Sequence, residues 1–326
     1  MTTKSLSDIS YLIDNELEHF NELFKKSLKS DIGLVDLITR YILKQKGKKI
    51  RPLLVLLSSK LCGGITERSY HGAALIELLH TATLVHDDVV DNAETRRSFP
   101  SINAVWKNKI AVLMGDYLLA KGLMVSMEGN DYDFLRIITD TVRRMSEGEL
   151  LQISKTRRLN IDEKTYFRII SDKTASLLST CCQIGAKAAT DDEVKISAMK
   201  AFGENLGIAF QIRDDILDYI GTNKLFGKPL GGDIKEKKIT LPLMYALKQA
   251  PSEKAKRIIS LIKKGAKNVD VEEIIKFVKE YGGIEYAEKV AKEYSEKAKN
   301  NLNIFDSTDS RLGMEALVNF VIERKN

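Results

Sequence analysis

The sequence contains few of the residues that break regular structure or cross-link a chain. Its 326 residues include 20 glycines and 5 prolines, together about 8% of the chain, against an average of about 12%. So few turn residues disfavour an all-β fold and favour long helices. Cysteine occurs only as Cys62, Cys181 and Cys182. An odd number without a CxxC spacing excludes a disulfide scaffold and is typical of reduced thiols in a reducing compartment.

Long apolar runs and a strong charge excess are also missing. No stretch approaches the ~20 residues that a membrane span needs. The N-terminus has no signal-peptide core and is too acidic for a transit peptide, so we predict a cytoplasmic protein without a membrane span. The net charge of +6 and the single tryptophan do not supply the basic, aromatic surface that binds nucleic acid, and we predict no nucleic-acid partner.

Apolar residues instead recur at helical spacing along almost the whole chain. Helices are predicted over 5–45 with breaks near 30–33, from 51 to the glycines at 63 and 64, over 102–127, 131–157 and 162–188, and through the C-terminal segment. Residues 67–92 and 194–220 are apolar nearly all round, which is typical of helices in the middle of a fold. The sequence therefore predicts one all-α domain spanning residues 1–326.

Two acidic segments with the same spacing lie at the C-terminal ends of these two apolar helices. They contain Asp87, Asp88 and Asp91, and Asp214, Asp215 and Asp218. One such segment alone could be a solvated helix end. Two of them, with like charges one turn apart at the unfavourable end of the helix dipole, call for a bound cation. A few oxygen ligands without His or Cys suit Mg²⁺ that shares phosphate oxygens with a substrate.

Basic residues near these segments could hold the phosphates. Arg96 and Arg97 follow the first acidic segment directly, which favours a role in the site over a solvated face. Lysines taken singly are usually solvated. Those with a candidate role are Lys48, Lys173, Lys228 and Lys238, with Arg51 beside the first of them. His80 lies two helical turns before Asp87 on roughly the same face, where a phosphate contact competes with simple core packing.

The chain resembles the trans-type isoprenyl diphosphate synthases, the family of farnesyl, geranylgeranyl and longer polyprenyl diphosphate synthases. The resemblance covers about residues 40–245 and is carried by GKKIRP, LLHTATLVHDDVVDNAETRRS, GDYLLAKG, GEL, DKTASLL, FGENLGIAFQIRDDILDY and GKPLGGDIKEKKITLP. It implies an all-α barrel of helices around a deep apolar cavity, the isoprenoid synthase fold, and a homodimer.

The resemblance also implies a role for each group of residues. Isopentenyl diphosphate is expected at Lys48, Arg51, His80 and Arg97. The allylic diphosphate is expected at Arg96, Lys173, Thr174, Gln211, Lys228 and Lys238. Mg²⁺ is expected at Asp87, Asp91 and Asp214, with Asp88, Asp215 and Asp218 in support.

Such a site implies ionisation, condensation and elimination. Metal ions and basic side chains stabilise the charge on the departing diphosphate, so that the allylic carbon–oxygen bond ionises. The double bond of isopentenyl diphosphate then attacks the cation, and loss of a proton leaves a chain five carbons longer in a new trans unit. The apolar helices exclude water from the cation, and no nucleophilic side chain is needed.

Product length is predicted from the residues that precede Asp87. An extended isoprene unit is close to one helical turn, about 5.4 Å, so each bulky residue on this helix face would end the chain about one unit later. Ala82 and Thr83 are small and leave the path open, Leu79 lies a turn deeper, and Met124 or Met127 could lie near the floor. We therefore predict a long-chain product of roughly octaprenyl size, with geranylgeranyl or farnesyl diphosphate as alternatives.

Two other functions on the same fold fit the sequence less well. A terpene cyclase usually keeps one aspartate motif and needs no isopentenyl diphosphate site, whereas this chain has both motifs together with Lys48, Arg51 and His80. A non-catalytic partner subunit would predict damaged aspartates or arginines, and none is damaged. Both alternatives are therefore remote.

Overall fold

A computed structural model of the chain describes residues 6–45, 47, 49–96, 99–159, 161–221 and 230–324. The elements are α1 (Leu6–Ser10), η1 (Tyr11–Ile13), α2 (Asp14–Ser27), α3 (Gly33–Lys44), α4 (Ile50–Cys62), α5 (Glu67–Val90), β1 (Thr95–Arg96), β2 (Phe99–Pro100), α6 (Ile102–Glu128), α7 (Tyr132–Arg158), α8 (Glu163–Ile170), η2 (Ser171–Ala175), α9 (Ser176–Ala189), α10 (Glu193–Ile220), α11 (Gly232–Lys235), α12 (Leu241–Gln249), α13 (Ser252–Lys264), α14 (Asn268–Glu280), α15 (Gly283–Asn301) and α16 (Asp309–Glu323). The prediction of an all-α fold is therefore confirmed.

Two local features differ from the helical pattern of the sequence. The two-residue strands β1 and β2 form a small antiparallel hairpin directly after α5. The helix predicted over 162–188 is divided, because the π-helical segment η2 separates α8 from α9. Helical periodicity cannot reveal such a segment, since a single turn with one extra residue hardly disturbs the spacing of apolar residues.

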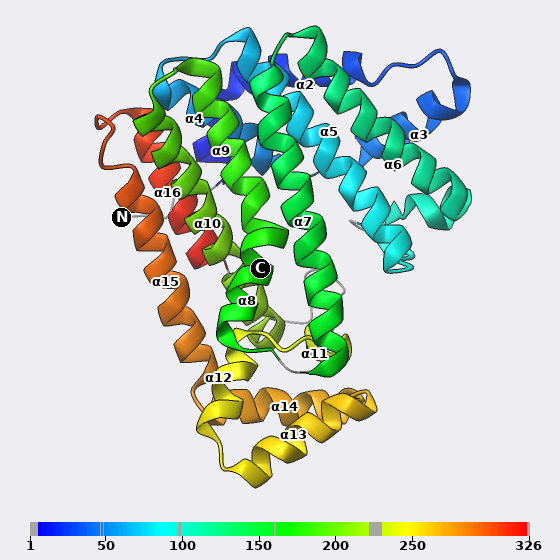
Figure 1. Ribbon diagram of the computed structural model, residues 1–326, viewed down its shortest axis with the longest axis vertical. Coiled ribbons are helices and arrows are strands. Elements are labelled where there is room, and N and C mark those ends of the chain that lie inside the picture. The colour runs from blue at the N-terminus through cyan, green and yellow to red at the C-terminus, as the bar shows by residue number, and fades with distance from the viewer. Residues whose placement is uncertain are drawn as a thin grey trace.

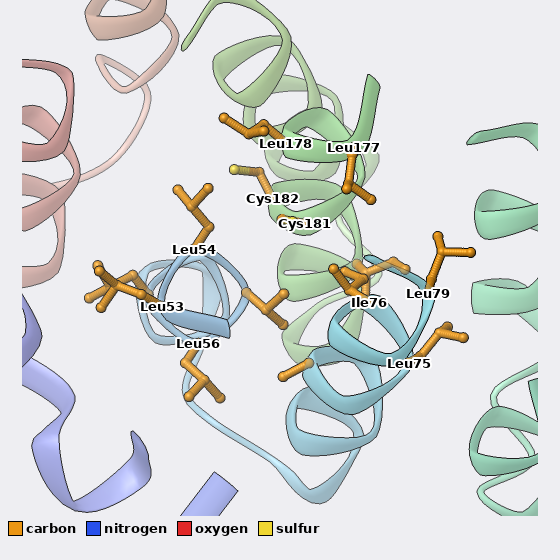
Figure 2. Packing of buried hydrophobic residues seen from close by; sticks show 14 of the residues in the cluster. Leu53, Leu54, Leu56, Leu75, Ile76, Leu79, Leu177, Leu178, Cys181 and Cys182 are labelled. Carbon is orange, nitrogen blue, oxygen red and sulfur yellow. The ribbon is translucent and has the colours of Figure 1, made fainter. Parts of the chain in front are cut away.

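The long helices α5, α7, α9 and α10 run roughly side by side, and α13 and α14 cross beyond their lower ends (Figure 1). Buried side chains form two clusters. The first lies among α4, α5, α6 and α9 and includes Leu54, Ile76 and Leu178 (Figure 2). The second lies among α8 and α12–α15.

The helix α10 belongs to both clusters. Phe202 near its start packs in the first cluster, whereas Ile216 near its end packs in the second. Val85 near the end of α5 belongs to the first cluster. The two acidic segments are therefore held by different parts of the core, Asp87–Asp91 beside the first and Asp214–Asp218 beside the second.

The helix α6 bears on two expectations. It is long and apolar enough to cross a membrane by length and composition, with a mean hydropathy of 1.5 over 18 residues, and within the described ranges no other helix is. Asp116 and Lys121 interrupt its apolar run, which is why the linear sequence did not reveal it. Helices in soluble proteins pass the same test, and α6 packs along α5, where Gly122 lies against Leu78. The expectation that Met124 or Met127 lies near a cavity floor is wrong, since they are 48% and 56% exposed.

Candidate functional site

The first aspartate motif lies at the end of α5. Asp87 and Asp88 belong to its last turn, and Asp91 caps it, donating its backbone N–H to the carbonyl of Asp87 at 2.8 Å. Asp88 is 2% exposed. The hairpin that follows folds Arg96 back over it, and Nε and Nη2 of Arg96 both lie 2.6 Å from Asp88 Oδ1. The central carboxylate of this motif is therefore buried and neutralised by a cation.

Asp87 connects this motif to the other side of the site. Desolvation raises the pKa of Asp87, the ammonium group of Lys173 opposes that rise, and the carboxylates of Glu149 and Asp91 add to it. Lys173 belongs to η2 and Glu149 to α7, so both elements lie near the end of α5. Asp87 therefore carries a charge that its surroundings leave only partly compensated.

The central carboxylate of the second motif, Asp215, is held differently. It is 4% exposed and accepts hydrogen bonds from the hydroxyl of Tyr166 at 2.7 Å and from Nε2 of Gln211 at 2.8 Å. The Thr174 hydroxyl donates to Oε1 of Gln211 at 2.8 Å. Burial and the charge of Asp233 raise the pKa of Asp215 well above its usual range, although the two hydrogen bonds oppose that rise.

Backbone amides hold the last carboxylate of the second motif. Asp218 accepts the N–H groups of Gly232 at 2.9 Å and Asp233 at 3.0 Å, where the short helix α11 begins. Gly231 precedes this turn with a φ of 74°, which favours glycine, and an added Cβ would lie 2.2 Å from Val271. Burial and the charge of Asp218 raise the pKa of Asp233 to about 6. The turn therefore adds a fourth acidic group beside the second motif.

The outer carboxylate of this motif faces the C-terminal segment. The side chain of Asp214 is 57% exposed, and Arg324 Nη2 lies 2.8 Å from its Oδ1. The guanidinium of Arg324 also lies over the ring of Phe210, 4.1 Å from the ring centroid. The backbone carbonyl of Arg324 accepts hydrogen bonds from both Nε and Nη2 of Arg213. A residue 110 positions further along the chain therefore closes one side of the motif.

Beside the second motif lies a cavity of about 100 Å³ that brings together several predicted residues, although none of the aspartates of the first motif lines it. Its lining includes Lys173, Thr174, Gln211, Asp215 and Lys238. The structure therefore brings these five residues together, and their roles stay predictions.

Both lysine ammonium groups in this cavity form ion pairs with carboxylates. Lys173 Nζ lies 2.5 Å from Glu149, and Lys238 Nζ lies 2.5 Å from Glu236. Burial lowers the pKa of Lys238, but Glu236, Asp233 and Asp91 raise it above its usual value. Asp91 and Lys238 thus interact across the site, as Asp87 and Lys173 do.

Five residues of the site were not predicted from the sequence. They are Glu149, Gln152, Tyr166, Asp233 and Arg324. Glu149 and Asp233 fall in the segments GEL and GGDIKEKK, and an acidic residue beside glycines is a usable signal for a site. The sequence carries no comparable signal for Tyr166 or Arg324, since only the fold brings them to the aspartates.

A second cavity of about 340 Å³ lies beside α5. Lys49, Glu77, His80, Asp88 and Arg96 line it together with residues of α2 and α3. His80 therefore lines a cavity, and its contact with a phosphate stays a prediction.

The other residues expected at isopentenyl diphosphate are only partly placed. Arg51 is partly buried in the first turn of α4 and is not part of the lining of this cavity. Lys48, Arg97 and Lys228 lie outside the residues that the structure describes.

The donor set fits a hard cation that brings its own further ligands. Across the described ranges, no group of three or more His, Cys, Asp or Glu side chains is arranged to hold a metal ion by itself. Asp88 and Asp215 are already bound by protein donors. Oxygen donors remain at Asp87, at Asp91 and at Oδ2 of Asp214, whose Oδ1 accepts from Arg324. Burial, with the nearby carboxylates of Glu149 and Asp91, raises the pKa of Asp87, and a bound cation would oppose that rise.

The residues predicted to set product length lie in the buried part of α5. Leu79 and Ala82 are each 2% exposed, and the hydroxyl of Thr83 donates to the carbonyl of His80 at 2.9 Å. None of the three lines either cavity beside the aspartate motifs. Their role stays a prediction.

Comparisons with known proteins gave a family model and several relatives. Residues 33–278 match the family model described as polyprenyl synthetase. The chain is 34% identical to the short chain isoprenyl diphosphate synthase of Methanothermobacter thermautotrophicus, with 95% of this chain and 96% of the relative covered. It is 35% identical to heptaprenyl diphosphate synthase component 2 of Bacillus subtilis, with 100% and 90% covered.

A solved structure is similar over the whole length. The polyprenyl synthase from Caulobacter crescentus CB15, complexed with calcium and isoprenyl diphosphate, matches with a TM-score of 0.92 at 31% identity, and all of both chains is covered.

Proposed function

Because the chain belongs to the polyprenyl synthetase family of prenyltransferases and has its all-α isoprenoid synthase fold, we propose that it is a Mg²⁺-dependent synthase of long-chain polyprenyl diphosphates. It condenses isopentenyl diphosphate with an allylic diphosphate in the trans geometry. One observation carries the proposal: Lys173 and Lys238 share a cavity with Asp215 and interact electrostatically with Asp87 and Asp91. Both aspartate motifs therefore meet one pair of cations.

This arrangement supports binding of the allylic diphosphate between the motifs. Asp87, Asp91 and Asp214 would hold Mg²⁺, which supplies Lewis-acid stabilisation of the leaving diphosphate. Asp88, Asp215 and Asp218 would support these ligands. Hydrogen bonds from protein groups hold each of the three supporting carboxylates in place. Lys173, Lys228 and Lys238 contribute positive charge toward the diphosphate oxygens. Arg96, which the resemblance assigns to the same substrate, instead pairs with Asp88 and lines the other cavity.

Residues of the cavity prepare the ionisation step. Lys173 and Lys238 exchange a carboxylate partner for a diphosphate oxygen, and their charge stabilises the negative charge that grows as the carbon–oxygen bond breaks. The hydrogen-bonded chain from Thr174 through Gln211 to Asp215 fixes side-chain oxygens that face the allylic cation. The released diphosphate takes the proton that is lost after condensation.

Isopentenyl diphosphate occupies the larger cavity beside α5 in this proposal. His80 lines that cavity, and Arg51, with Lys48 and Arg97, completes the set that holds its diphosphate. The two substrates then lie on different sides of Asp88 and Arg96, which border the cavity for isopentenyl diphosphate. The double bond can thus approach the allylic carbon while each diphosphate keeps its own cations.

The product is a chain of about octaprenyl length, roughly eight isoprene units at one helical turn each. Small side chains at Ala82 and Thr83 support this length, whereas the relatives include both a short chain synthase and a heptaprenyl synthase component. Geranylgeranyl diphosphate is the alternative. Ala82→Phe is expected to shorten the product and Leu79→Ala to lengthen it. Unchanged product length in both folded variants contradicts the assignment.

The chain acts as one domain in a cytoplasmic homodimer in this proposal. The exposed face of α6 includes Val105, Val112, Leu113, Met124 and Met127, and a second copy would remove this apolar surface from water. Cys62, Cys181 and Cys182 are buried free thiols, which suits a reducing compartment. Sedimentation equilibrium measures the dimer, and Leu113→Glu is expected to weaken it.

The decisive experiment is a product assay. The purified protein is incubated with labelled isopentenyl diphosphate, Mg²⁺ and either farnesyl or geranylgeranyl diphosphate, and the dephosphorylated products are sized by reversed-phase chromatography. Elongated all-trans products that require Mg²⁺ support the proposal. Unchanged primers, or a cyclised product without uptake of isopentenyl diphosphate, overturn it.

A further inference from the structure

The segment η2 presents two residues of the proposed diphosphate site. It is a single π-helical turn in which the amide of Ser176 donates to the carbonyl of Ser171, five residues earlier. One extra residue in a turn rotates the following side chains by about 100°, and Lys173 and Thr174 both line the cavity beside the second aspartate motif. Turns of this kind are rare and persist only where surrounding contacts hold them.

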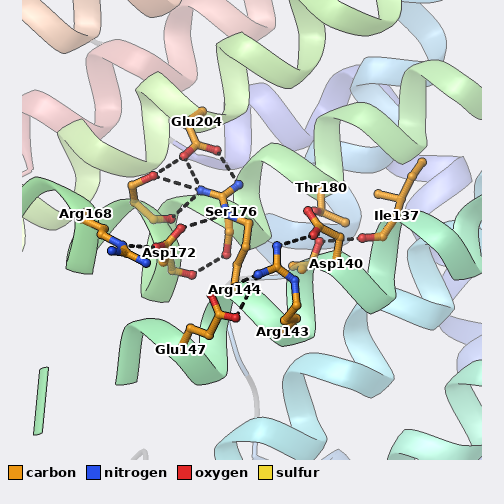
Figure 3. A network of polar contacts seen from close by, with 12 residues as sticks. Ile137, Asp140, Arg143, Arg144, Glu147, Arg168, Asp172, Ser176, Thr180 and Glu204 are labelled. Carbon is orange, nitrogen blue, oxygen red and sulfur yellow. Dashed lines mark hydrogen bonds and ion pairs between the residues drawn. The ribbon is translucent and has the colours of Figure 1, made fainter. Parts of the chain in front are cut away.

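Arg144 of α7 holds this turn from outside the cavity. Its Nε donates to Asp172 Oδ1 at 2.9 Å (Figure 3). Its Nη2 donates to Ser171 Oγ at 3.0 Å. The same Nη2 donates to Glu204 Oε1 of α10 at 2.8 Å, and the Ser171 hydroxyl donates to that carboxylate as well. One guanidinium therefore ties α7, the π-turn and α10 together.

Glycines let the two flanking helices approach the backbone of the same turn. An added Cβ at Gly148 of α7 would lie 2.9 Å from the backbone nitrogen of Lys173, and one at Gly207 of α10 would lie 2.5 Å from Cα of Ala175. Neither position leaves room for a side chain. The backbone of the turn is therefore packed between α7 and α10, and Arg144 joins these two helices to it.

We propose that Arg144 is a positioning residue for the allylic diphosphate. By joining Asp172 and Ser171 to Glu204, it fixes the π-turn in the register that presents Lys173 and Thr174 to the substrate. This inference rests on the proposed function. Arg144 itself is not part of the cavity lining, so it acts through the turn and not by contact with substrate.

The neighbouring residue gives a matched control. Arg143 carries the same side chain on the same helix but pairs with Asp140 and Glu147 of its own helix, and it is 57% exposed (Figure 3). Arg143→Met removes an equal charge and an equal number of methylene groups without touching the π-turn. A general effect of charge or solubility would appear in both variants.

The test compares steady-state kinetics of Arg144→Met, Arg144→Lys and Arg143→Met with farnesyl diphosphate and isopentenyl diphosphate. A displaced turn is expected to lower kcat/KM for farnesyl diphosphate in Arg144→Met by about 10- to 100-fold. Most of that loss appears as a higher KM for the allylic substrate, and the KM for isopentenyl diphosphate stays within about twofold of wild type. Arg144→Lys recovers part of the loss, and Arg143→Met behaves as wild type.

Calorimetric binding of an unreactive thiolodiphosphate analogue of farnesyl diphosphate, with Mg²⁺, must weaken in parallel. If Arg144→Met does not fold, Glu204→Gln is expected to show the same selective loss at smaller size. Its amide oxygen still accepts from Ser171 and from Nη2 of Arg144, but the charge and the acceptor for Nη1 are lost. An unchanged allylic KM, or an equal rise for both substrates, overturns the inference while wild type remains active. An inactive wild-type protein would instead show that the proposed function is wrong.

Discussion

The two aspartate motifs share one sequence pattern, yet the fold surrounds their central carboxylates with opposite chemistry. Asp88 is buried against the guanidinium of Arg96, so its charge is paired. Asp215 is equally buried but receives only neutral donors, Tyr166 and Gln211, and its pKa is raised well above the usual range. The central carboxylate of the first motif is thus paired with a cation, whereas that of the second lies beside a further acidic group, Asp233.

This difference gives the two motifs unequal tasks. Asp218 and Asp233 also have raised pKa values at the second motif, which therefore gains from a bound cation. At the first motif, Arg96 compensates the buried charge and leaves the outer carboxylates for metal. Four predictions test this contrast, from the largest expected effect to the smallest.

Loss of an outer carboxylate should have the largest effect in either motif. Asp87→Asn is expected to lower kcat/KM on the order of 1000-fold, and Asp214→Asn at least on the order of 100-fold, because each removes a proposed metal ligand. Steady-state kinetics at saturating Mg²⁺ measure both. Asp191→Asn, whose carboxylate is 96% exposed, serves as the control. A loss below about tenfold in either variant would contradict the shared-metal arrangement.

Removing the guanidinium of Arg96 from the first motif should lower the stability of the protein. Arg96→Met leaves Asp88 buried and unpaired, and the free energy of unfolding is expected to fall by about 3 kcal/mol. Asp88→Asn in the same chain removes the orphaned charge and should restore most of that loss. Urea denaturation of the two variants measures this. If the double variant is no more stable than Arg96→Met, the guanidinium of Arg96 does not compensate the charge of Asp88.

Asp233 beside the second motif should make the stability of the protein depend on pH. Asp233 has a folded pKa of about 6, above its value in an unfolded chain, so the folded state binds the proton more tightly. Stability of the metal-free protein therefore falls as pH rises from about 4 to 6. Asp233→Asn is expected to stabilise the protein by about 2 kcal/mol at pH 7 and hardly at all at pH 4. Denaturation in EDTA at both pH values measures the difference, and an equal gain at both would refute it.

The neutral donors of the second motif give the smallest effect. Tyr166→Phe removes one hydrogen bond to Asp215 and is expected to cost about 1 kcal/mol of stability. Tyr219→Phe is a matched control, because its buried hydroxyl bonds Thr240 instead of an aspartate. Both variants should lose similar stability, but only Tyr166→Phe should raise the Mg²⁺ concentration needed for half-maximal activity. The same Mg²⁺ response in both would deny Tyr166 a role in the site.

The contrast also shows what could be predicted from the sequence. Helical periodicity predicted α4 to α7 and α10 almost to their ends, because those segments are long and strongly patterned. Spacing and resemblance assigned Thr174, Gln211, Asp215 and Lys238 to the candidate site, and the four residues line one cavity. Local pattern is sufficient wherever one helix face carries the signal.

The environment of each aspartate could not be predicted in the same way. Tyr166 and Arg324 reach the second motif from 49 and 110 residues away, and periodicity carries no information on such contacts. The exposure of Met124 and Met127 was missed because an apolar helix does not reveal which of its faces is covered. The π-turn was missed because it adds only one residue to an otherwise regular helix.

Binding of one diphosphate by both motifs through shared metal is tested most directly by crystallography. Crystals grown with Mg²⁺ and the farnesyl thiolodiphosphate analogue are predicted to show the diphosphate between Asp87, Asp91 and Asp214. Lys173 and Lys238 should have left Glu149 and Glu236 for its oxygens. A diphosphate bound to only one motif, with the other turned toward bulk water, would contradict the proposed function of the paired motifs.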